Sequence, residues 1–179
     1  MKVAVLGAGG MGATVIRHLK ECDLVSNIVA HDLRATRVEE LREKFDIEAT
    51  TNLKDVLCDP QVLCTVITAS NDAHAGLAIA ALQAGKAVLC EKPMATTLED
   101  ARAMVECAEA TGGFLQIGFE LRYSRLYSTV KTWINDGLLG DVVNTQCNYI
   151  ASAWKKNTWR ADGLGGGMFG EKLSHYVDL

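Results

Sequence analysis

Val3-Ala4-Val5-Leu6-Gly7-Ala8-Gly9-Gly10-Met11-Gly12 is the stretch that decides the fold. Four apolar residues lead directly into a Gly7-x-Gly9-x-x-Gly12 turn, and residues 13–19 then have the apolar spacing of a helix. A strand, a glycine turn and a helix in this order suit a dinucleotide pyrophosphate. Gly7 permits the tight turn, Gly9 lets the backbone approach the phosphates, and Gly12 lets helix and strand pack closely. The helix N-terminus would offer its N–H groups to the anion.

An acidic residue at the end of the second expected strand gives an independent test of this interpretation. Ile28-Val29-Ala30-His31-Asp32 is a short apolar run whose last residue lies 20 positions after Gly12. A carboxylate there can accept hydrogen bonds from both adenosine ribose hydroxyls and would repel a 2′-phosphate, which favours NAD. Arg34 could instead hold that phosphate, which keeps NADP as the alternative. The structural alternative is a tight turn without a ligand and an Asp32 that only caps the next helix.

The bulk composition is that of an ordinary globular protein. The chain has 179 residues, of which 49% are hydrophobic and 22% charged, enough for one domain or one domain and a piece of another. A net charge of −4 gives no reason to expect nucleic-acid binding, and no apolar run is long enough to span a membrane. The first strand begins at the N-terminus and leaves no room for a signal peptide.

The six cysteines are scattered along the chain. They form no Cys-x-x-Cys pair and have no histidine at the spacing of a metal site. We therefore expect no metal, and a reduced, cytoplasmic protein.

Strands and helices alternate up to residue 119. This order predicts a complete doubly wound parallel-sheet α/β domain, a Rossmann domain, over residues 1–119. Six strands are expected at 3–6, 28–32, 47–50, 62–67, 86–90 and 114–118. Helices are expected at 13–19, 34–44, 53–57, 74–84 and 98–110.

Two polar segments follow expected strands of this sheet. Thr68-Ala69-Ser70-Asn71 comes after the strand at 62–67, and Glu91-Lys92-Pro93 comes after the strand at 86–90. Ligands of open α/β sheets bind at the carboxyl ends of the strands. Both segments are therefore predicted to line the site.

The pattern changes in residues 120–179. A helix at 124–136 and a long strand at 142–150 are followed by a polar loop at 153–162 with tryptophans, a glycine run and a last helix at 168–179. A single long strand has no sheet to join. We interpret residues 120–179 as the incomplete start of an α+β substrate and oligomerisation domain, so that either the chain is a fragment or a partner chain supplies the missing strands.

Three motifs together resemble the glucose–fructose oxidoreductase / inositol dehydrogenase / rhizopine catabolism family. They are Gly7-Ala8-Gly9-Gly10-Met11-Gly12, then Gly85-Lys86-Ala87-Val88-Leu89-Cys90-Glu91-Lys92-Pro93, and finally Trp159-Arg160 before Gly165-Gly166-Gly167 and Glu171-x-x-x-His175. The resemblance covers the whole chain. It implies an NAD(P)-dependent oxidoreductase that transfers a hydride between nicotinamide and a carbinol carbon of a sugar, inositol or related polyol. It also implies a homo-oligomer in the full-length form. The alternatives are a non-catalytic dinucleotide-binding regulator of the same family and an inactive fragment.

The resemblance assigns catalytic roles to three residues. It places Lys92 beside the nicotinamide, where it would hydrogen-bond the substrate hydroxyl, often with a cis peptide before Pro93. His175 matches the family's histidine, and Glu171 stands where the family has aspartate. A spacing of four residues puts Glu171 and His175 on one helical face. The longer glutamate, and Leu173 at a position that is often glycine, leave the substrate class open.

The remaining predictions follow from the glycine turn, the polar segments and the resemblance together. His74 matches a family histidine but could equally be structural, and the loop tryptophans could equally be packing anchors. The predicted cofactor-binding residues are Gly7, Gly9, Gly10, Met11, Gly12, Asp32, Arg34, Thr68, Ala69, Ser70, Asn71, His74, Glu91 and Lys92. The predicted substrate-binding residues are Lys92, Arg122, Asn157, Trp159, Arg160 and His175.

Overall fold

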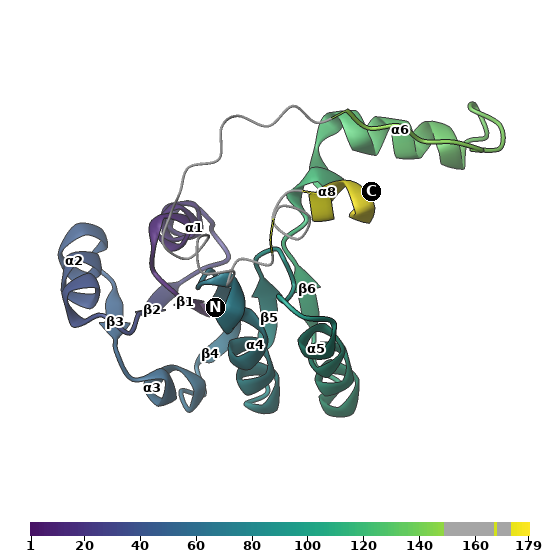
Figure 1. Cartoon of the computed structure of the whole chain (residues 1–179). Coiled ribbons are helices and arrows are strands. Elements are labelled where there is room, and N and C mark those ends of the chain that lie inside the picture. The colour runs from purple at the N-terminus through teal and green to yellow at the C-terminus, as the bar shows by residue number, and fades with distance from the viewer. Residues whose placement is uncertain (149–166, 168–172) are drawn as a thin grey trace.

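A computed structural model describes residues 1–148, 167 and 173–179. Six parallel strands form one sheet in the order β3-β2-β1-β4-β5-β6 (Figure 1). This order confirms the predicted doubly wound fold. The strands are β1 (Lys2–Leu6), β2 (Asn27–His31), β3 (Glu48–Thr50), β4 (Val62–Ile67), β5 (Ala87–Cys90) and β6 (Leu115–Ile117).

Helices cover both faces of the sheet. One face packs against α1 (Gly10–Lys20) and α2 (Ala35–Phe45). The other face packs mainly against α3 (Leu53–Leu57), α4 (His74–Gln83) and α5 (Leu98–Thr111). Because side chains alternate along a strand, β1 sends Val5 into the first layer and Ala4 and Leu6 into the second. Burial on both faces explains why the central strands β1, β4 and β5 are largely apolar.

Local capping sets the ends of α5, the longest described helix. Its N-cap residue Thr97 accepts a hydrogen bond at Oγ1 from the Asp100 N–H, at 3.1 Å. The chain leaves the helix through Gly112, whose φ of +60° is in the left-handed region that favours glycine. The sequence predicts this start, and it places the end of the helix one residue earlier.

Among the residues after 119 that the structure describes, fewer form secondary structure than the sequence predicts. A 3₁₀ turn, η2 (Glu120–Tyr123), leads into α6 (Arg125–Asn135), and a short helix, α8 (Ser174–Asp178), comes near the end. The prediction of a strand at 142–150 is wrong for residues 142–148, which are described and have no regular secondary structure. The physical reason is that a strand needs a hydrogen-bonding neighbour, and all six strands of the described sheet belong to residues 1–119.

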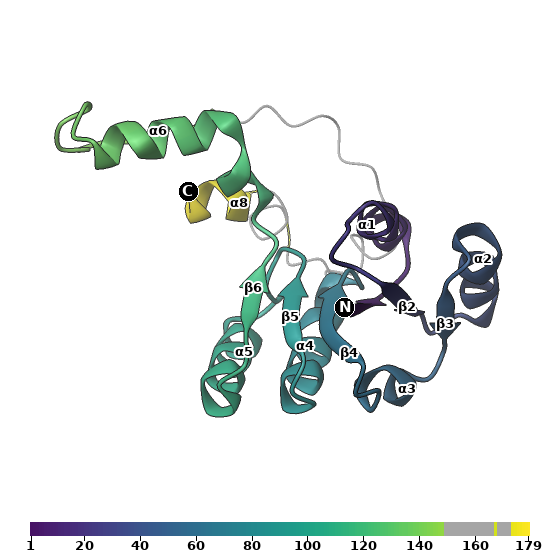
Figure 2. The same ribbon diagram turned by 180° about the vertical axis from the view of Figure 1, so that it is seen from behind.

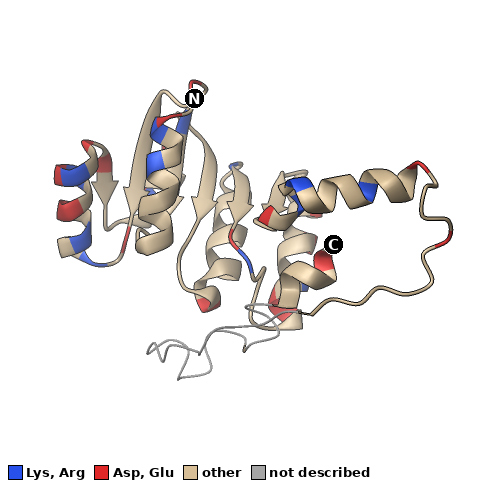
Figure 3. Ribbon diagram, turned by 90° about the horizontal axis from the view of Figure 1, so that it is seen from above, with Lys and Arg blue, Asp and Glu red and all other residues tan. Residues whose placement is uncertain are grey.

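The arrangement of α6 and α8 is visible from both sides. Figures 1 and 2 show α6 reaching away beyond β6, with α8 between it and the carboxyl end of the sheet. Figure 3 shows the charged residues mainly on helices and turns, with few on the strands. Within residues 1–148, 167 and 173–179, no helix is long and apolar enough to cross a membrane.

Candidate functional site

An open cavity of about 840 Å³ lies at the carboxyl ends of β1, β2 and β4. The strand order reverses here, because the chain runs from β1 out to β3 and then returns to β4 beside β1. This is the position at which open α/β sheets bind ligands. The lining residues are Gly7, Gly9, Gly10, His31, Asp32, Leu33, Arg34, Thr51, Asn52, Leu53, Thr68, Ala69, Ser70, Asn71, Ala73 and Leu77.

The three glycines of the turn are required for different reasons. Gly7 has φ +90°, and a Cβ there would lie 2.4 Å from the Ala69 Cα. A Cβ on Gly12 would lie 2.4 Å from the Gly7 carbonyl oxygen, so this glycine allows α1 to pack against the turn. A Cβ on Gly9 would meet no protein atom within 4 Å, and no side chain caps α1 there. The space beside Gly9 and the uncapped N–H groups therefore fit a dinucleotide pyrophosphate.

The polar segment after β4 lies where the sequence predicts it. Thr68 Oγ1 donates a hydrogen bond to the Gly7 carbonyl oxygen, which ties the end of β4 to the glycine turn. Thr68 and the next three residues all line the cavity. Of the predicted cofactor contacts in the turn, Met11 is half exposed, and neither Met11 nor Gly12 lines the cavity.

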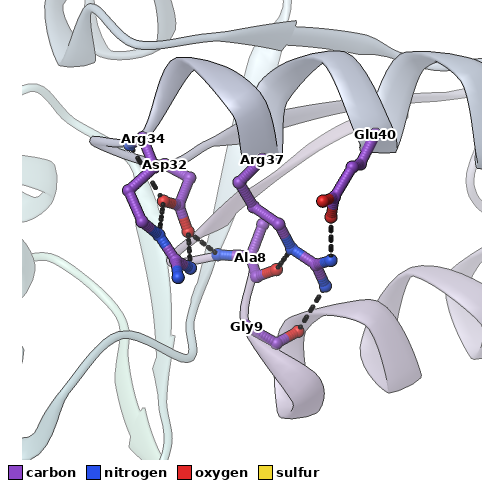
Figure 4. Close-up of polar contacts among 6 residues, drawn as sticks. All are labelled: Ala8, Gly9, Asp32, Arg34, Arg37 and Glu40. Atoms are coloured by element: carbon purple, nitrogen blue, oxygen red, sulfur yellow. Dashed lines mark hydrogen bonds and ion pairs between the residues drawn. The ribbon is translucent and has the colours of Figure 1, made fainter.

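Asp32 lies at the edge of the cavity and is held by Arg34 (Figure 4). The Arg34 side chain donates to Oδ1 through Nε at 3.0 Å and to Oδ2 through Nη2 at 3.3 Å. The Ala8 N–H also donates to Oδ2, at 3.1 Å. Burial raises the pKa of Asp32, but the hydrogen bonds from Arg34 and Ala8 outweigh burial and hold the pKa below its ordinary value. The site therefore carries an ionised carboxylate, together with an arginine whose side chain is 66% exposed.

The sequence predictions lack Arg37, which contacts the glycine turn, and several residues that line the cavity. The missed lining residues are His31, Leu33, Thr51, Asn52, Leu53, Ala73 and Leu77. Arg37 on α2 donates hydrogen bonds to the carbonyl oxygens of Ala8 and Gly9. His31 is buried and lines the cavity, and within the described part of the chain its Nε2 has no hydrogen-bond partner. The role of Arg37 has no signal in the sequence, because its contacts with the glycine turn are made only when α2 lies beside that turn.

His74 joins two loops at the same edge of the sheet. It is 1% exposed, with Nδ1 2.7 Å from the Pro93 carbonyl oxygen and Nε2 3.3 Å from the Ala69 carbonyl oxygen. Burial lowers its pKa, although both carbonyl contacts act in the opposite direction. His74 does not line the cavity. These contacts favour the structural alternative for this residue.

The segment after β5 continues the edge towards β6. The bond between Lys92 and Pro93 is a cis peptide, as the resemblance implies. Glu91 Oε2 accepts a hydrogen bond from the Lys92 N–H at 3.3 Å. Burial raises the pKa of Glu91, and the nearby Glu120 carboxylate raises it further. Lys92 itself is half-buried in this turn.

His175 lies on α8, against the turn that leaves β6. Its Nε2 is 3.5 Å from Glu120 Oε1, and its ring meets the Phe119 ring edge-on at a centroid distance of 6.1 Å. Arg122, a predicted substrate-binding residue, forms an ion pair with Asp178 instead. No sequence pattern points to Glu120 and Asp178, which lie 55 and 56 residues from their partners. The other predicted residues here, Glu171, Asn157, Trp159 and Arg160, lie outside the described residues.

Comparisons with known proteins agree with this geometry. Residues 1–119 match the family model described as "Oxidoreductase family, NAD-binding Rossmann fold". The inositol 2-dehydrogenase of Salmonella typhimurium is 37% identical over 144 residues, which cover 78% of this chain and 43% of that protein. The scyllo-inositol 2-dehydrogenase (NADP(+)) of Bacillus subtilis is 26% identical over 185 residues, which cover 99% of this chain and 50% of that protein.

A solved structure described as an NAD-binding protein from Listeria innocua superposes on 99% of this chain and 52% of its own, with a TM-score of 0.83 and 26% identity. The chain thus spans about half the length of the relatives it matches. The family model covers well over half of the chain. The chain therefore belongs to the oxidoreductase family with the NAD-binding Rossmann fold, which is the glucose–fructose oxidoreductase / inositol dehydrogenase / rhizopine catabolism family that its motifs resemble.

Proposed function

We propose that this chain is the cofactor-binding part of an NAD(P)-dependent oxidoreductase that acts on a carbinol carbon of inositol, a sugar or a related polyol. The observation that carries the proposal is the cavity at the reversal point of the sheet, with Gly9 and Gly10 on one side and Asp32 and Arg34 on the other. The names of the relatives, inositol 2-dehydrogenases, support the substrate class. Six free thiols support a reducing, cytoplasmic location.

The chemistry divides between the cofactor and two side chains. The nicotinamide would supply the hydride acceptor or donor. Lys92, in the turn after β5, would hydrogen-bond the substrate hydroxyl and take its proton at Nζ. His175, next to Glu120, would receive or return that proton at a ring nitrogen. Glu171, four residues before His175, would orient the substrate or the imidazole.

Asp32 and Arg34 together support NAD as the cofactor, with NADP as the alternative. The Asp32 carboxylate is ionised and lies at the cavity, so it can accept hydrogen bonds from ribose hydroxyls once Arg34 turns away. A 2′-phosphate would instead keep Arg34 in the site as its counter-ion. Asp32→Ser removes the repulsion, and we expect it to strengthen NADP⁺ binding relative to NAD⁺ by about 10-fold. Titration of both cofactors measures the ratio, and an unchanged ratio would show that Asp32 does not discriminate.

The central test measures cofactor binding and turnover separately. NAD⁺ and NADP⁺ are titrated into the chain, and reduction of each is followed at 340 nm with a panel of inositols, polyols and aldoses. We expect Lys92→Ala to lower kcat by about 10²-fold or more while leaving the cofactor Kd within a factor of a few. Lys131→Ala on exposed α6 is the control.

The possible results separate the candidate functions. Binding without turnover of any substrate by this chain would favour an inactive fragment or a non-catalytic dinucleotide-binding regulator. The same result with the full-length form would contradict catalysis and favour the regulator. Failure of wild type to bind either dinucleotide would contradict both functions.

A further inference from the structure

The glycine turn is held between two charged side chains, one on each side of residue 8 (Figure 4). On one side, the Ala8 N–H donates to Asp32 Oδ2 at 3.1 Å. On the other side, Arg37 Nε donates to the Ala8 carbonyl oxygen and Arg37 Nη2 donates to the Gly9 carbonyl oxygen at 3.3 Å. Two consecutive carbonyl groups of the turn therefore face α2.

The direction of these carbonyl groups fixes the direction of two N–H groups. In a trans peptide the C=O and the N–H of the same unit point to opposite sides. The carbonyl of Ala8 shares its peptide with the N–H of Gly9, and the carbonyl of Gly9 shares its peptide with the N–H of Gly10. When both carbonyls face Arg37, both N–H groups face away from it. Gly9 and Gly10 line the cavity, and these are N–H groups that a pyrophosphate would need.

The Arg37 side chain is itself fixed in this position. It is 25% exposed, and its Nη1 forms an ion pair with Glu40 Oε2 at 2.6 Å, one turn further along α2. Three nitrogens of the planar guanidinium thus serve three acceptors at once. A lysine ammonium carries the same charge but has no rigid fork with which to span two carbonyl groups.

We propose that Arg37 is a positioning residue that fixes the Ala8–Gly9 peptide, and helps the Ala13 N–H of α1 to hold the Gly9–Gly10 peptide, so that the N–H groups of Gly9 and Gly10 are ready for the cofactor pyrophosphate. The proposal rests on the proposed cofactor binding and adds a residue to it. A turn that is already in its binding conformation loses less conformational entropy when the ligand arrives. Glycines are the residues for which that loss is largest.

The experiment compares a ligand that has the pyrophosphate with one that lacks it. Affinities of the chain for NAD⁺ are measured by calorimetry, and affinities for adenosine by nuclear magnetic resonance titration. We expect Arg37→Met to weaken NAD⁺ binding by about 10-fold or more, since two charge-assisted hydrogen bonds to the turn are lost. Adenosine binding should stay within about 2-fold, since a nucleoside has no phosphate for the turn to hold. Arg37→Lys should resemble Arg37→Met.

Arg42→Met is the matched control. Arg42 lies on the same helix and also donates two guanidinium hydrogen bonds to a carbonyl oxygen, that of Ala49, which does not line the cavity. We expect it to leave both affinities unchanged.

Several results would overturn the proposal. If Arg37→Lys binds NAD⁺ as tightly as wild type does, the positive charge of residue 37 matters and its two hydrogen bonds to the turn do not. An equal loss for adenosine and NAD⁺ in Arg37→Met, or an equal loss of NAD⁺ binding in Arg42→Met, would assign it to general stability of the fold. Unchanged NAD⁺ affinity in Arg37→Met would overturn the inference alone, whereas a wild-type chain that binds no dinucleotide would overturn the proposed function with it.

Discussion

Helices α5 and α6 begin in the same way and end up in different surroundings. Each has a hydroxyl residue at its N-cap, Thr97 and Ser124, whose side-chain oxygen accepts a hydrogen bond from an N–H of the first turn. In α5, Met104 is fully buried between helix and sheet. In α6 no residue is buried, and the side chains of Leu126, Trp133 and Ile134 are 66%, 45% and 42% exposed. The difference teaches that capping and apolar spacing specify a helix, whereas burial needs a second surface.

The same difference separates residues 1–119 from the described residues after them. The first region has two buried apolar clusters, one on each face of its sheet. In the second region, α8 meets η2 through the ion pair Arg122–Asp178 and through the contact of His175 Nε2 with Glu120 Oε1 at 3.5 Å. Each contact has one partner that is more than half exposed, and polar contacts open to water contribute about 0–1 kcal/mol each, far less than a buried cluster. The structure thus has a well-packed cofactor region, with a candidate catalytic residue held to it by weaker contacts.

The largest expected effect tests this contrast directly. Leu82 on α4 is 1% exposed, and Leu82→Ala should lower the free energy of unfolding by about 2–5 kcal/mol, because it leaves a cavity in the core. Ile134 on α6 is 42% exposed, and Ile134→Ala should change the same quantity by no more than about 0.5 kcal/mol. Urea unfolding curves of the two variants measure both. Equal losses would mean that the apolar side of α6 is covered in solution.

A smaller effect sharpens the comparison inside the cofactor region. Gly12→Ala places a Cβ 2.4 Å from the Gly7 carbonyl oxygen and should cost about 1–3 kcal/mol of stability. The Cβ added by Gly9→Ala would have no protein atom within 4 Å, so the free energy of unfolding of this variant should stay within about 0.5 kcal/mol of wild type. It should nevertheless weaken NAD⁺ binding by about 10-fold, because the methyl group occupies space that the ligand needs. Melting curves and NAD⁺ titrations of the two variants measure both effects. If Gly9→Ala binds NAD⁺ as tightly as wild type does, the space beside Gly9 is not occupied by the ligand.

The smallest effect concerns a buried histidine of the same region. The pKa of His74 is lowered from 6.5 by burial, so between its folded pKa and 6.5 the unfolded chain binds more protons than the folded chain. The contribution of His74 to stability therefore falls as the pH is lowered through 6.5, by at most about 1.4 kcal/mol per pH unit for one proton. His31, whose pKa is lowered in the same way, acts in the same direction. Urea unfolding at pH 7.5, 6.5 and 5.5 measures the slope.

Two variants separate the histidines in this measurement. His74→Gln should flatten the slope, because it removes one titrating group whose pKa changes on folding. His18→Gln, at an exposed position of α1, is the matched control for replacing a histidine by glutamine. A slope unaffected by His74→Gln would mean that this residue does not contribute.

The sequence predicts the cofactor region well because its patterns are local. Continuous apolar runs, caps such as Thr97 and left-handed glycines such as Gly112 act within a few residues, and they give all six strands and the strand-helix alternation. The same reasoning fails at residues 142–148. Their sequence has a high strand propensity, but no strand of the described residues lies beside them to pair with. Strand propensity describes how well a side chain fits a sheet, so it predicts a strand only where a sheet is available.

The sequence by itself determined the fold class, the glycine turn, Asp32 and the family, because each depends on residue types at fixed spacings. Only the tertiary structure decided which side chains meet at the site. Arg37 reaches the glycine turn 28 residues before it, and Glu120 reaches His175 55 residues after it. Such contacts arise when strands from distant parts of the chain end at one edge of a sheet, and no short-range pattern encodes them. The tertiary structure also decided that His74 joins two loops through their carbonyl oxygens, since its sequence position was compatible with either role.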